Sequence, residues 1–516
     1  MTPTSLADIV KAYDVRGTVP DQLDTRVTRA LGAAFAEVVV RGQHTSDGTS
    51  EVTGTEGARP TNDRASRPAH PTPHTDPTPR TDRTATGCVV GHDMRDSSPE
   101  LVGAFADGAR SRGVDVTLIG LASTDALYYA SGALDLPGAM FTASHNPAAY
   151  NGIKLCRAGA RPVGQDTGLA DVRALAERIL DGDVPDPGGP SGELTHRDVL
   201  ADYAAFLRGL VDLSGSRPLT VVVDAGNGMG GHTVPAVLGT EAGLPELPLT
   251  IVPLYFELDG TFPNHEANPL DPRNLVDLQA AVREHHADLG LAFDGDADRC
   301  FVVDERGEPV SPSAITGLIA RREVARAVAN GADAGHVAVV HNVITSAQVP
   351  EVIAATGARA IRTRVGHSFI KAEMARHGAV FGGEHSAHYY FRDFWYADTG
   401  MLAAMHVLAA LGEQPEPLSA VMADLQRYAA SGEINSTVPD AAAATERVRA
   451  WAAHEGVETD ELDGLTVVHG GGEGDPMWWL NLRASNTEPL LRLNVEAADE
   501  ATMARVRDAV LDVIRS

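Results

Sequence analysis

Short apolar runs alternate along the chain with longer stretches in which apolar positions recur every three or four residues. The first pattern is typical of buried strands and the second of amphipathic helices. Strands are predicted at 89–91, 116–120, 139–142, 219–224, 289–293 and 337–340. Helices are predicted near 22–39, 99–112, 167–181, 272–286, 312–329, 368–377 and 400–411. This alternation indicates an α/β fold with largely parallel sheets.

Near the C-terminus the pattern changes. Residues 478–483 and 490–495 look like paired strands, and 499–514 look like a closing amphipathic helix. We therefore expect a separate α+β domain at this end. The length of 516 residues allows three or four domains as a prior.

One segment does not fit any core. Residues 41–87 contain no Leu, Ile, Phe, Tyr, Trp or Met and are rich in Thr, Pro, Asp, Arg and Gly. Such a stretch buries too little apolar surface to offset the entropy lost on ordering. We expect a disordered insertion there, and a linker at 181–192, which is rich in Pro, Gly and Asp.

The composition excludes several classes of partner. A net charge of −28 argues against nucleic acid and against an anionic membrane surface. No apolar run is long enough to span a bilayer, and the first residues lack a basic region followed by an apolar one. The three cysteines, Cys88, Cys156 and Cys300, form no CxxC pair. We expect a cytoplasmic protein without disulfides.

The most informative stretch is Leu-Ala-Phe-Asp-Gly-Asp-Ala-Asp-Arg at 291–299. Asp294, Asp296 and Asp298 stand at alternating positions, so an extended backbone points all three carboxylates the same way. Three like charges that close repel unless a cation lies between them. Oxygen ligands without nearby His or Cys suit Mg²⁺ before Zn²⁺. Arg299 places a positive charge beside this predicted site.

Two other interpretations of this stretch have to be weighed. Asp-Gly-Asp most often forms a solvated turn. An EF-hand loop would place Glu305 at its twelfth position, but it needs Gly at the sixth, where this chain has Arg299. The Cys-Phe-Val-Val that follows favours a strand over the rest of a calcium loop.

A second candidate is Thr-Ala-Ser-His-Asn-Pro at 142–147, which follows a predicted strand. Open α/β sheets bind ligands at such strand ends, and Ser144 is presented there beside His145. Lys154, in Asn-Gly-Ile-Lys, could return a positive charge to the serine. A plain turn is the alternative. A serine hydrolase is disfavoured because no GxSxG motif surrounds Ser144.

Further motifs accompany these two in a fixed order. They are Tyr-Asp-Val-Arg-Gly (13–17), Val-Gly-His-Asp-Met-Arg-Asp-Ser-Ser (90–98), Asp-Ala-Gly-Asn-Gly (224–228), Val-Gly-His-Ser (365–368), Gly-Glu-His-Ser-Ala-His (383–388) and Arg-Ala-Ser-Asn-Thr-Glu-Pro (483–489). Each is weak to moderate alone. Together they make the chain resemble the α-D-phosphohexomutase family, and within it the bacterial phosphomannomutases and phosphoglucomutases.

The resemblance implies a four-domain architecture around a central cleft, with three α/β domains of mixed sheets and a C-terminal α+β domain. The expected domains are 1–190, 191–308, 309–427 and 428–516. The first would carry the phosphoserine loop, with 41–87 inserted, and the others the metal loop, the sugar-binding loop and the phosphate-binding loop. Ser144 would carry the phosphate, and one Mg²⁺ would be held by Asp294, Asp296, Asp298 and the phosphorylated Ser144.

The resemblance also assigns expected roles. Phosphoryl transfer develops negative charge that nearby cations can stabilise. The residues expected at the reacting phosphate are Arg16, His145, Lys154 and Arg299. Those expected to bind the substrate are Glu384, Ser386 and His388 in the sugar loop, Arg364 and His367, and Arg483, Ser485, Asn486 and Thr487 in the distal phosphate clamp. Ala387 departs from the family pattern, because many relatives have Gly there.

The expected activity is the reversible conversion of a hexose 6-phosphate to the 1-phosphate, with mannose before glucose. A hexose 1,6-bisphosphate would be both intermediate and activator. A phosphoglucosamine mutase is the nearest alternative, and a metal-dependent sugar phosphatase is the alternative from another class. A binding protein without activity is disfavoured, because the serine and all three carboxylates are present. The expected assembly is a monomer or a small homo-oligomer.

Overall fold

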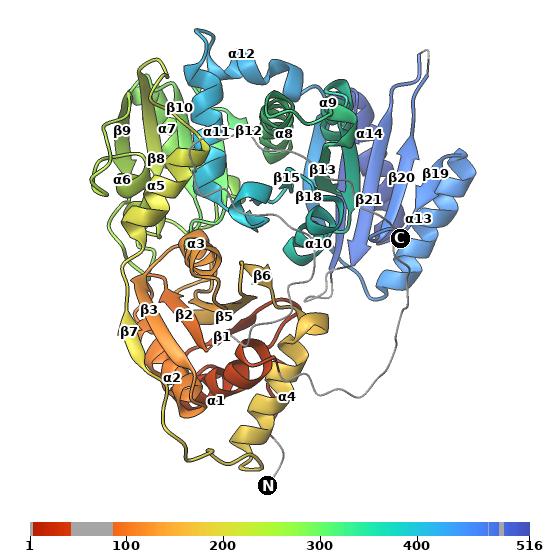
Figure 1. The fold of residues 1–516 in the computed structure, drawn as a ribbon. Helices are drawn as coiled ribbons and strands as arrows, with labels where there is room; N and C mark the ends of the chain where they lie inside the picture. Colours follow the sequence, from red (N-terminus) through yellow and green to blue (C-terminus); the bar gives the residue numbers. More distant parts are fainter. Residues whose placement is uncertain (1–3, 43–85, 473, 485–489) are drawn as a thin grey trace, which may run out of the picture.

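The computed structural model describes residues 4–42, 86–472, 474–484 and 490–516. Within them the chain forms four sheets in sequence order, each covered by its own helices (Figure 1). Three sheets are mixed and the last is antiparallel. The predicted fold class is thereby confirmed. Of the predicted insertion, 43–85 lie outside the described residues, and its last residue, Gly87, already begins strand β2.

The first sheet has the order β1-β5-β4-β2-β3-β7, with β6 paired to β5. Its strands are β1 Val15–Thr18, β2 Gly87–His92, β3 Asp115–Leu121, β4 Gly138–Phe141, β5 Tyr150–Arg157, β6 Arg161–Pro162 and β7 Leu194–His196. The four helices of this part are α1 Thr25–Phe35, α2 Ser98–Ser111, α3 Thr124–Leu134 and α4 Leu169–Leu180. Helix α1 starts after Asp24, whose carboxylate accepts a hydrogen bond of 2.7 Å from the backbone amide of Val27. The helix continues as a π-helix at Ala36–Val40.

The second sheet has the order β12-β11-β10-β8-β9. Its strands are β8 Leu219–Asp224, β9 Leu249–Leu254, β10 Leu289–Phe293, β11 Cys300–Asp304 and β12 Pro309–Val310, and its helices are α5 Leu200–Leu210, α6 Gly230–Val237 and α7 Val276–Glu284. Strand β10 is buried along its whole length, as expected of a continuous apolar run between two strands. It runs parallel to β8 and antiparallel to β11. The acidic loop therefore forms the turn between β10 and β11.

The third sheet has the order β14-β13-β15-β16-β17. Its strands are β13 Ala338–Asn342, β14 Arg359–Thr363, β15 Phe381–Gly383, β16 Tyr389–Phe391 and β17 Ala397–Asp398. Its helices are α8 Pro312–Ala329, α9 Gln348–Ala355, α10 His367–His377, α11 Gly400–Gly412 and α12 Leu418–Met422. The predicted sugar loop is the turn between the antiparallel strands β15 and β16.

The fourth sheet is antiparallel, with the order β18-β22-β21-β20-β19. Its strands are β18 Ala429–Thr437, β19 Glu458–Asp460, β20 Leu465–His469, β21 Trp478–Ala484 and β22 Leu490–Ala497, and its helices are α13 Ala441–Glu455 and α14 Glu500–Arg515. The predicted strand pair is thus the β21–β22 hairpin. Arg483 lies near the end of β21, and its backbone is opposite that of Arg492 on β22 in the strand register.

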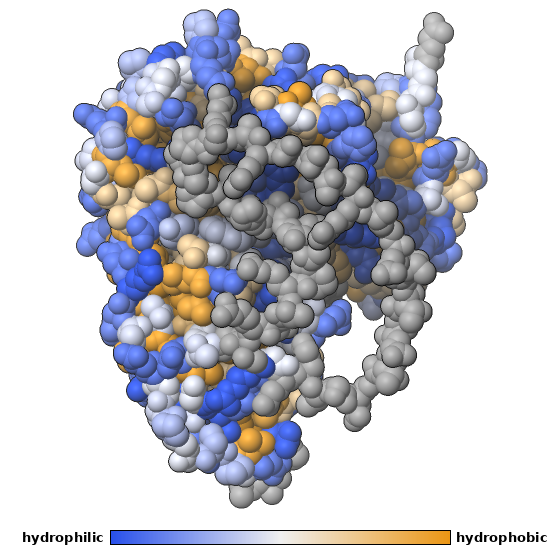
Figure 2. All heavy atoms as spheres, viewed as in Figure 1, coloured by the Kyte–Doolittle hydropathy of each residue, from blue (hydrophilic) through white to orange (hydrophobic). Residues whose placement is uncertain are grey.

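The buried apolar residues that the structure describes gather in four clusters, and the largest one runs through the first, second and third sheets. On the visible face of the described residues, hydrophobic side chains form small groups among hydrophilic ones (Figure 2). In the part of the chain that the structure describes, no helix combines the length and hydropathy needed to cross a membrane.

Candidate active site

The three loop carboxylates converge in the structure. Asp294, Asp296 and Asp298 are each no more than 1% exposed, and one oxygen from each lies within 4.8 Å of the others. Oδ1 of Asp296 and Oδ1 of Asp298 are buried without a hydrogen-bond partner among the described residues. Two unsatisfied carboxylate oxygens beside a third carboxylate fit a hard divalent cation, which takes oxygen ligands.

Ser144 meets this cluster from the first sheet. Its backbone is left-handed, with φ of 49°, and its hydroxyl donates to Asp294 Oδ2 at 2.8 Å. The Cβ of an alanine at position 295 would lie 2.4 Å from the carbonyl oxygen of Ser144. The glycine of Asp-Gly-Asp therefore lets the serine loop and the acidic loop touch.

Arg95 holds the serine loop from behind. Its guanidinium, buried in an ion pair with Asp93 at 3.1 Å, donates to the carbonyl oxygens of Ser144 at 3.0 Å and Asn146 at 2.7 Å. It also donates to those of Pro147 and Tyr150. One rigid side chain thus satisfies three carbonyls of the loop and that of Tyr150, the first residue of β5. Arg95 belongs to the motif at 90–98, but the sequence alone predicted no role for it.

Two cations balance the carboxylates. Lys154 Nζ lies 2.7 Å from Asp296 Oδ2 and 2.6 Å from Asp298 Oδ2. Burial alone would lower the pKa of Lys154, but the two carboxylates outweigh burial and raise it well above its usual value. Arg299 Nε donates to Asp294 Oδ2 at 2.8 Å. Even so, burial raises the pKa of Asp294 to about 7.

His145 lies between the serine and this arginine. Its Nδ1 is 3.2 Å from Ser144 Oγ and 2.7 Å from Arg299 Nη2, and since the guanidinium can only donate, Nδ1 accepts. Burial first, and then the Arg299 charge, hold the pKa of His145 well below its usual value. The imidazole is therefore neutral near pH 7.

The sugar loop joins the cluster from the third sheet. The backbones of Arg299 and His388 form an isolated antiparallel bridge, and His388 Nε2 lies 3.7 Å from Asp298 Oδ1. Ser386 Oγ is 3.0 Å from His388 Nδ1. Ala387 between them is buried, with φ of 65°. A left-handed non-glycine residue costs about 1–2 kcal/mol, so this departure from Gly leaves strain in the loop.

Glu384 is held firmly at the base of the loop. It is 2% exposed. Tyr390 OH donates to its Oε1 at 2.5 Å, and Asn342 Nδ2 and the Gly366 amide donate to Oε2 at 2.9 and 3.2 Å. Since each carboxylate oxygen can accept two hydrogen bonds, one acceptor position remains for a ligand in this arrangement.

Two residues reach toward the loops from other elements. Arg16 Nη1 donates to Asn146 Oδ1 at 2.7 Å, directly after the Ser144–His145 pair. His367 begins helix α10 and meets the ring of Tyr13 edge-on, with centroids 4.9 Å apart. Burial lowers the pKa of His367 to about 3, so it too is neutral near pH 7.

Two further predicted residues, Arg364 and Arg483, contact other partners than the three carboxylates in the structure. Arg364 is exposed and donates to the Leu462 carbonyl at 3.0 Å. Arg483 Nη2 pairs with Glu433 Oε2 at 3.1 Å. Ser485, Asn486 and Thr487 lie outside the described residues. The structure therefore brings together the predicted phosphoserine, metal and sugar-binding loops. The distal phosphate clamp remains a prediction.

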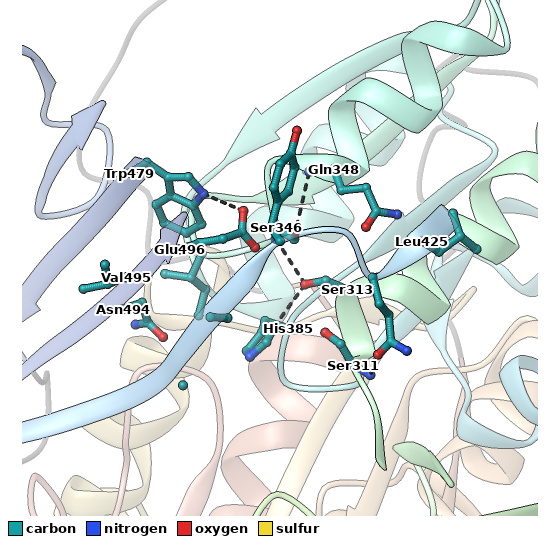
Figure 3. A pocket seen from close by; sticks show the side chains of 15 residues that line it. Ser311, Ser313, Ser346, Gln348, His385, Leu425, Trp479, Asn494, Val495 and Glu496 are labelled. Atoms are coloured by element: carbon teal, nitrogen blue, oxygen red, sulfur yellow. Dashed lines mark hydrogen bonds between the residues drawn. The ribbon is translucent and has the colours of Figure 1, made fainter. Parts of the chain in front are cut away.

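A cavity of roughly 100 Å³, lined by both polar and apolar side chains, lies between the third and fourth sheets (Figure 3). His385 points into it and contacts Ser313 Oγ at 3.0 Å through Nδ1. On the opposite side, Glu496 Oε1 accepts from Trp479 Nε1 and from the Ala347 amide, both at 2.8 Å. His385 thus faces away from the carboxylates, and Glu496 ties the fourth sheet to the start of α9.

Family models match nearly the whole described architecture. The match comprises phosphoglucomutase/phosphomannomutase α/β/α domain I over 78–180, domain II over 201–307, domain III over 311–428 and the C-terminal domain over 433–513.

This chain belongs to the phosphoglucomutase/phosphomannomutase family. A phosphomannomutase of Escherichia coli is 35% identical over 511 residues, covering 98% of both chains. A protein of Xanthomonas campestris named phosphohexose mutases is 36% identical, covering 96% of both. A solved family member from Burkholderia thailandensis is 29% identical with a TM-score of 0.79, covering 99% of this chain and 98% of that one.

A solved structure described as a putative phosphomannomutase from Thermus thermophilus, 20% identical, has the same fold, with a TM-score of 0.72 over 99% of this chain and all of that one. The resemblance inferred from the motifs is confirmed by these matches. They also confirm the predicted enzyme class, a phosphohexomutase. The roles of single residues remain predictions.

Proposed function

We propose that this phosphohexomutase interconverts the 6-phosphate and the 1-phosphate of a hexose, with mannose preferred, through a phosphoserine at residue 144 and a bisphosphorylated sugar. One observation carries the proposal. The Ser144 hydroxyl, 2.8 Å from Asp294 Oδ2, lies where three buried carboxylates and two cations from separate elements meet. A hydroxyl in such surroundings is suited to accept and release a phosphoryl group.

Mg²⁺ would be held by Asp294, Asp296 and Asp298 together with an oxygen of phosphorylated Ser144. The unpartnered oxygens of Asp296 and Asp298 support this assignment. When bound, the ion would act as a Lewis acid on the phosphoryl oxygens and stabilise the departing serine oxygen.

The residues of the chain supply the rest. In the first transfer, the bond between phosphorus and Ser144 Oγ breaks while a bond from the sugar oxygen to phosphorus forms. The sugar hydroxyl loses its proton in this step, and the serine oxygen takes one up, so that a free hydroxyl is restored. The freed Ser144 hydroxyl then donates to Asp294, as it does in the structure. Lys154 and Arg299 neutralise charge around the transferring group, and Arg16 orients the loop through Asn146.

A bisphosphorylated sugar must turn around before the second transfer. The sugar loop would bind hydroxyls in both orientations through Glu384, Ser386 and His388, with His367 and Arg364 near the sugar and its phosphate. Arg483, Ser485, Asn486 and Thr487 would hold the phosphate that is not reacting. Added hexose 1,6-bisphosphate should rephosphorylate Ser144 and so activate the enzyme.

The sugar preference and the reaction class can be tested together. We expect kcat/KM to be highest on mannose 1-phosphate, then on glucose 1-phosphate, and lowest on glucosamine 1-phosphate. The product should be the 6-phosphate isomer. Release of inorganic phosphate at the rate of substrate loss would instead establish a phosphatase.

Asp296→Asn should weaken Mg²⁺ binding at least about tenfold, because a neutral amide replaces a charged ligand. Thr124 and Lys154 donate to Oδ2 of Asp296. The amide oxygen of asparagine can accept both bonds at that position, so the fold should survive. Calorimetric titration with Mg²⁺ and a melting curve would measure both effects. Glu284→Gln, an exposed site on α7, removes the same charge as a control. Full activity of Asp296→Asn at sub-millimolar Mg²⁺ would count against the assignment.

Gly295→Ala should lower kcat about a hundred-fold and also lower the free energy of unfolding by roughly 1–3 kcal/mol, as overpacking of a buried site does. The new Cβ would lie 2.4 Å from the Ser144 carbonyl oxygen, so the serine loop must move by several tenths of an ångström or more. Displacements near 1 Å cost about 10²-fold in rate. Gly103→Ala on α2 meets no atom within 4 Å and is the matched control. Steady-state kinetics and melting temperatures measure the two effects, and an unchanged kcat would contradict the proposed approach of the two loops.

A further inference from the structure

The two oxygens of Asp296 have different surroundings. Oδ2 accepts from Thr124 Oγ1 at 2.6 Å and from Lys154 Nζ at 2.7 Å. Oδ1 is buried without a partner among the described residues. The Thr124 amide also donates to the Asp296 carbonyl oxygen at 3.0 Å. Thr124 therefore fixes both the main chain and the side chain of one predicted metal ligand.

Thr124 is itself held in place by its neighbours. It is the first residue of α3 and fully buried. Ser123 caps this helix by accepting from the Ala126 amide. The adjacent Asp125, 1% exposed, accepts from Tyr203 OH at 2.7 Å and from Thr399 Oγ1 at 2.6 Å.

These partners come from separate parts of the molecule, because Tyr203 lies on α5 and Thr399 caps α11. The start of α3 is thereby connected to a helix of the second sheet and to a helix of the third sheet. The backbone that carries Thr124 is thereby fixed, and a hydroxyl on a fixed backbone can direct a carboxylate with little freedom of its own.

We propose that Thr124 is a positioning residue that restricts Asp296 to single-oxygen ligation and so favours Mg²⁺ over Ca²⁺. With Oδ2 occupied by Thr124 and Lys154, only Oδ1 is left without a hydrogen-bond partner among the described residues. Mg²⁺ requires near-octahedral geometry at short distances, whereas Ca²⁺ tolerates carboxylates that bind through both oxygens. The inference rests on the metal site of the proposed function and names a selectivity determinant for it.

Thr124→Val isolates the hydroxyl. Valine keeps the volume and the amide hydrogen bond to the Asp296 carbonyl but cannot donate from its side chain. Mg²⁺ affinity should fall at least about tenfold, as expected when a partner that orients a ligand is lost. Ca²⁺ affinity should fall less, so the ratio of the two dissociation constants shifts toward Ca²⁺. Thr124→Ser, which restores the hydroxyl, should restore both values.

The measurements are calorimetric titrations of the full chain with MgCl₂ and with CaCl₂, next to melting curves. Thr502→Val is the matched control, because it removes a buried threonine hydroxyl that donates to Asp499 Oδ2 at 3.0 Å on α14 and makes no bond to Asp296. It should lower stability and leave Mg²⁺ affinity unchanged. If Thr124→Val does not fold, Thr124→Ala removes the same hydroxyl from a smaller side chain.

Wild-type Mg²⁺ affinity in Thr124→Val would overturn the inference. An equal loss of Mg²⁺ affinity in Thr502→Val would also overturn it, because a general loss of stability would then account for the effect. Asp296→Asn separates these failures from failure of the proposed function. If that variant binds Mg²⁺ as the wild type does, the metal site itself is wrong.

Discussion

Ser144→Ala is expected to lower kcat at least about a thousand-fold, as removal of a catalytic nucleophile does in other enzymes. The wild-type protein should carry one phosphate on Ser144, and the variant none. The physical reason is that no other described hydroxyl donates to the Asp294–Asp296–Asp298 cluster from a strained loop. Thr124 also donates to this cluster, but it starts a regular helix and is fully buried.

Intact-mass and peptide mass spectrometry, with mutase assays, would test this expectation. Ser111→Ala is the matched control, because Ser111 donates only within α2, to the Gly108 carbonyl. It should keep both the phosphate and the activity. Added glucose 1,6-bisphosphate should not rescue Ser144→Ala, since that variant has no oxygen to phosphorylate. A phosphate found only on another residue would refute the assignment of the carrier.

Much of the fold could be predicted because buried parallel strands are continuous apolar runs. Strands β8 and β10 and helix α8 have the predicted bounds. Edge strands carry no such signal: β14, Arg-Ala-Ile-Arg-Thr, is mostly exposed and was missed. The predicted helix 22–39 was too long at its start, because Asp24 caps α1 and the helix begins at Thr25.

The candidate site could be predicted where its chemistry is local in the sequence. Alternating carboxylates and a serine at a strand end are such local signals. Arg95 and Thr124 were missed because their roles come from contacts with distant segments: Arg95 reaches the Ser144 loop, and Thr124 reaches across to Asp296. The only signal for Arg95 was its place in a motif, and nothing in the sequence marked Thr124.

Arg483→Gln is the second variant with a large expected effect, and it distinguishes a mutase from a phosphatase. Each charged hydrogen bond to a phosphate contributes about 1.5–3 kcal/mol, so losing two would cost roughly 3–6 kcal/mol. In the structure Arg483 already pairs with Glu433, which Arg492 also approaches at 3.6 Å. Since binding must break or share that pair, we expect the lower end, about a hundred-fold in kcat/KM.

Arg483→Gln should also retain the bisphosphorylated sugar less well than the wild type does. Once its second phosphate loses an anchor, the bisphosphorylated sugar should escape and leave Ser144 without phosphate. Released bisphosphate should then appear in solution, and added glucose 1,6-bisphosphate should partly restore turnover. Arg449→Gln is the matched control, because Arg449 pairs with Glu446 at the exposed surface of α13. Wild-type kcat/KM on mannose 1-phosphate in Arg483→Gln would show that the clamp lies elsewhere. A phosphatase, which has no intermediate to retain, would release no bisphosphate in either variant.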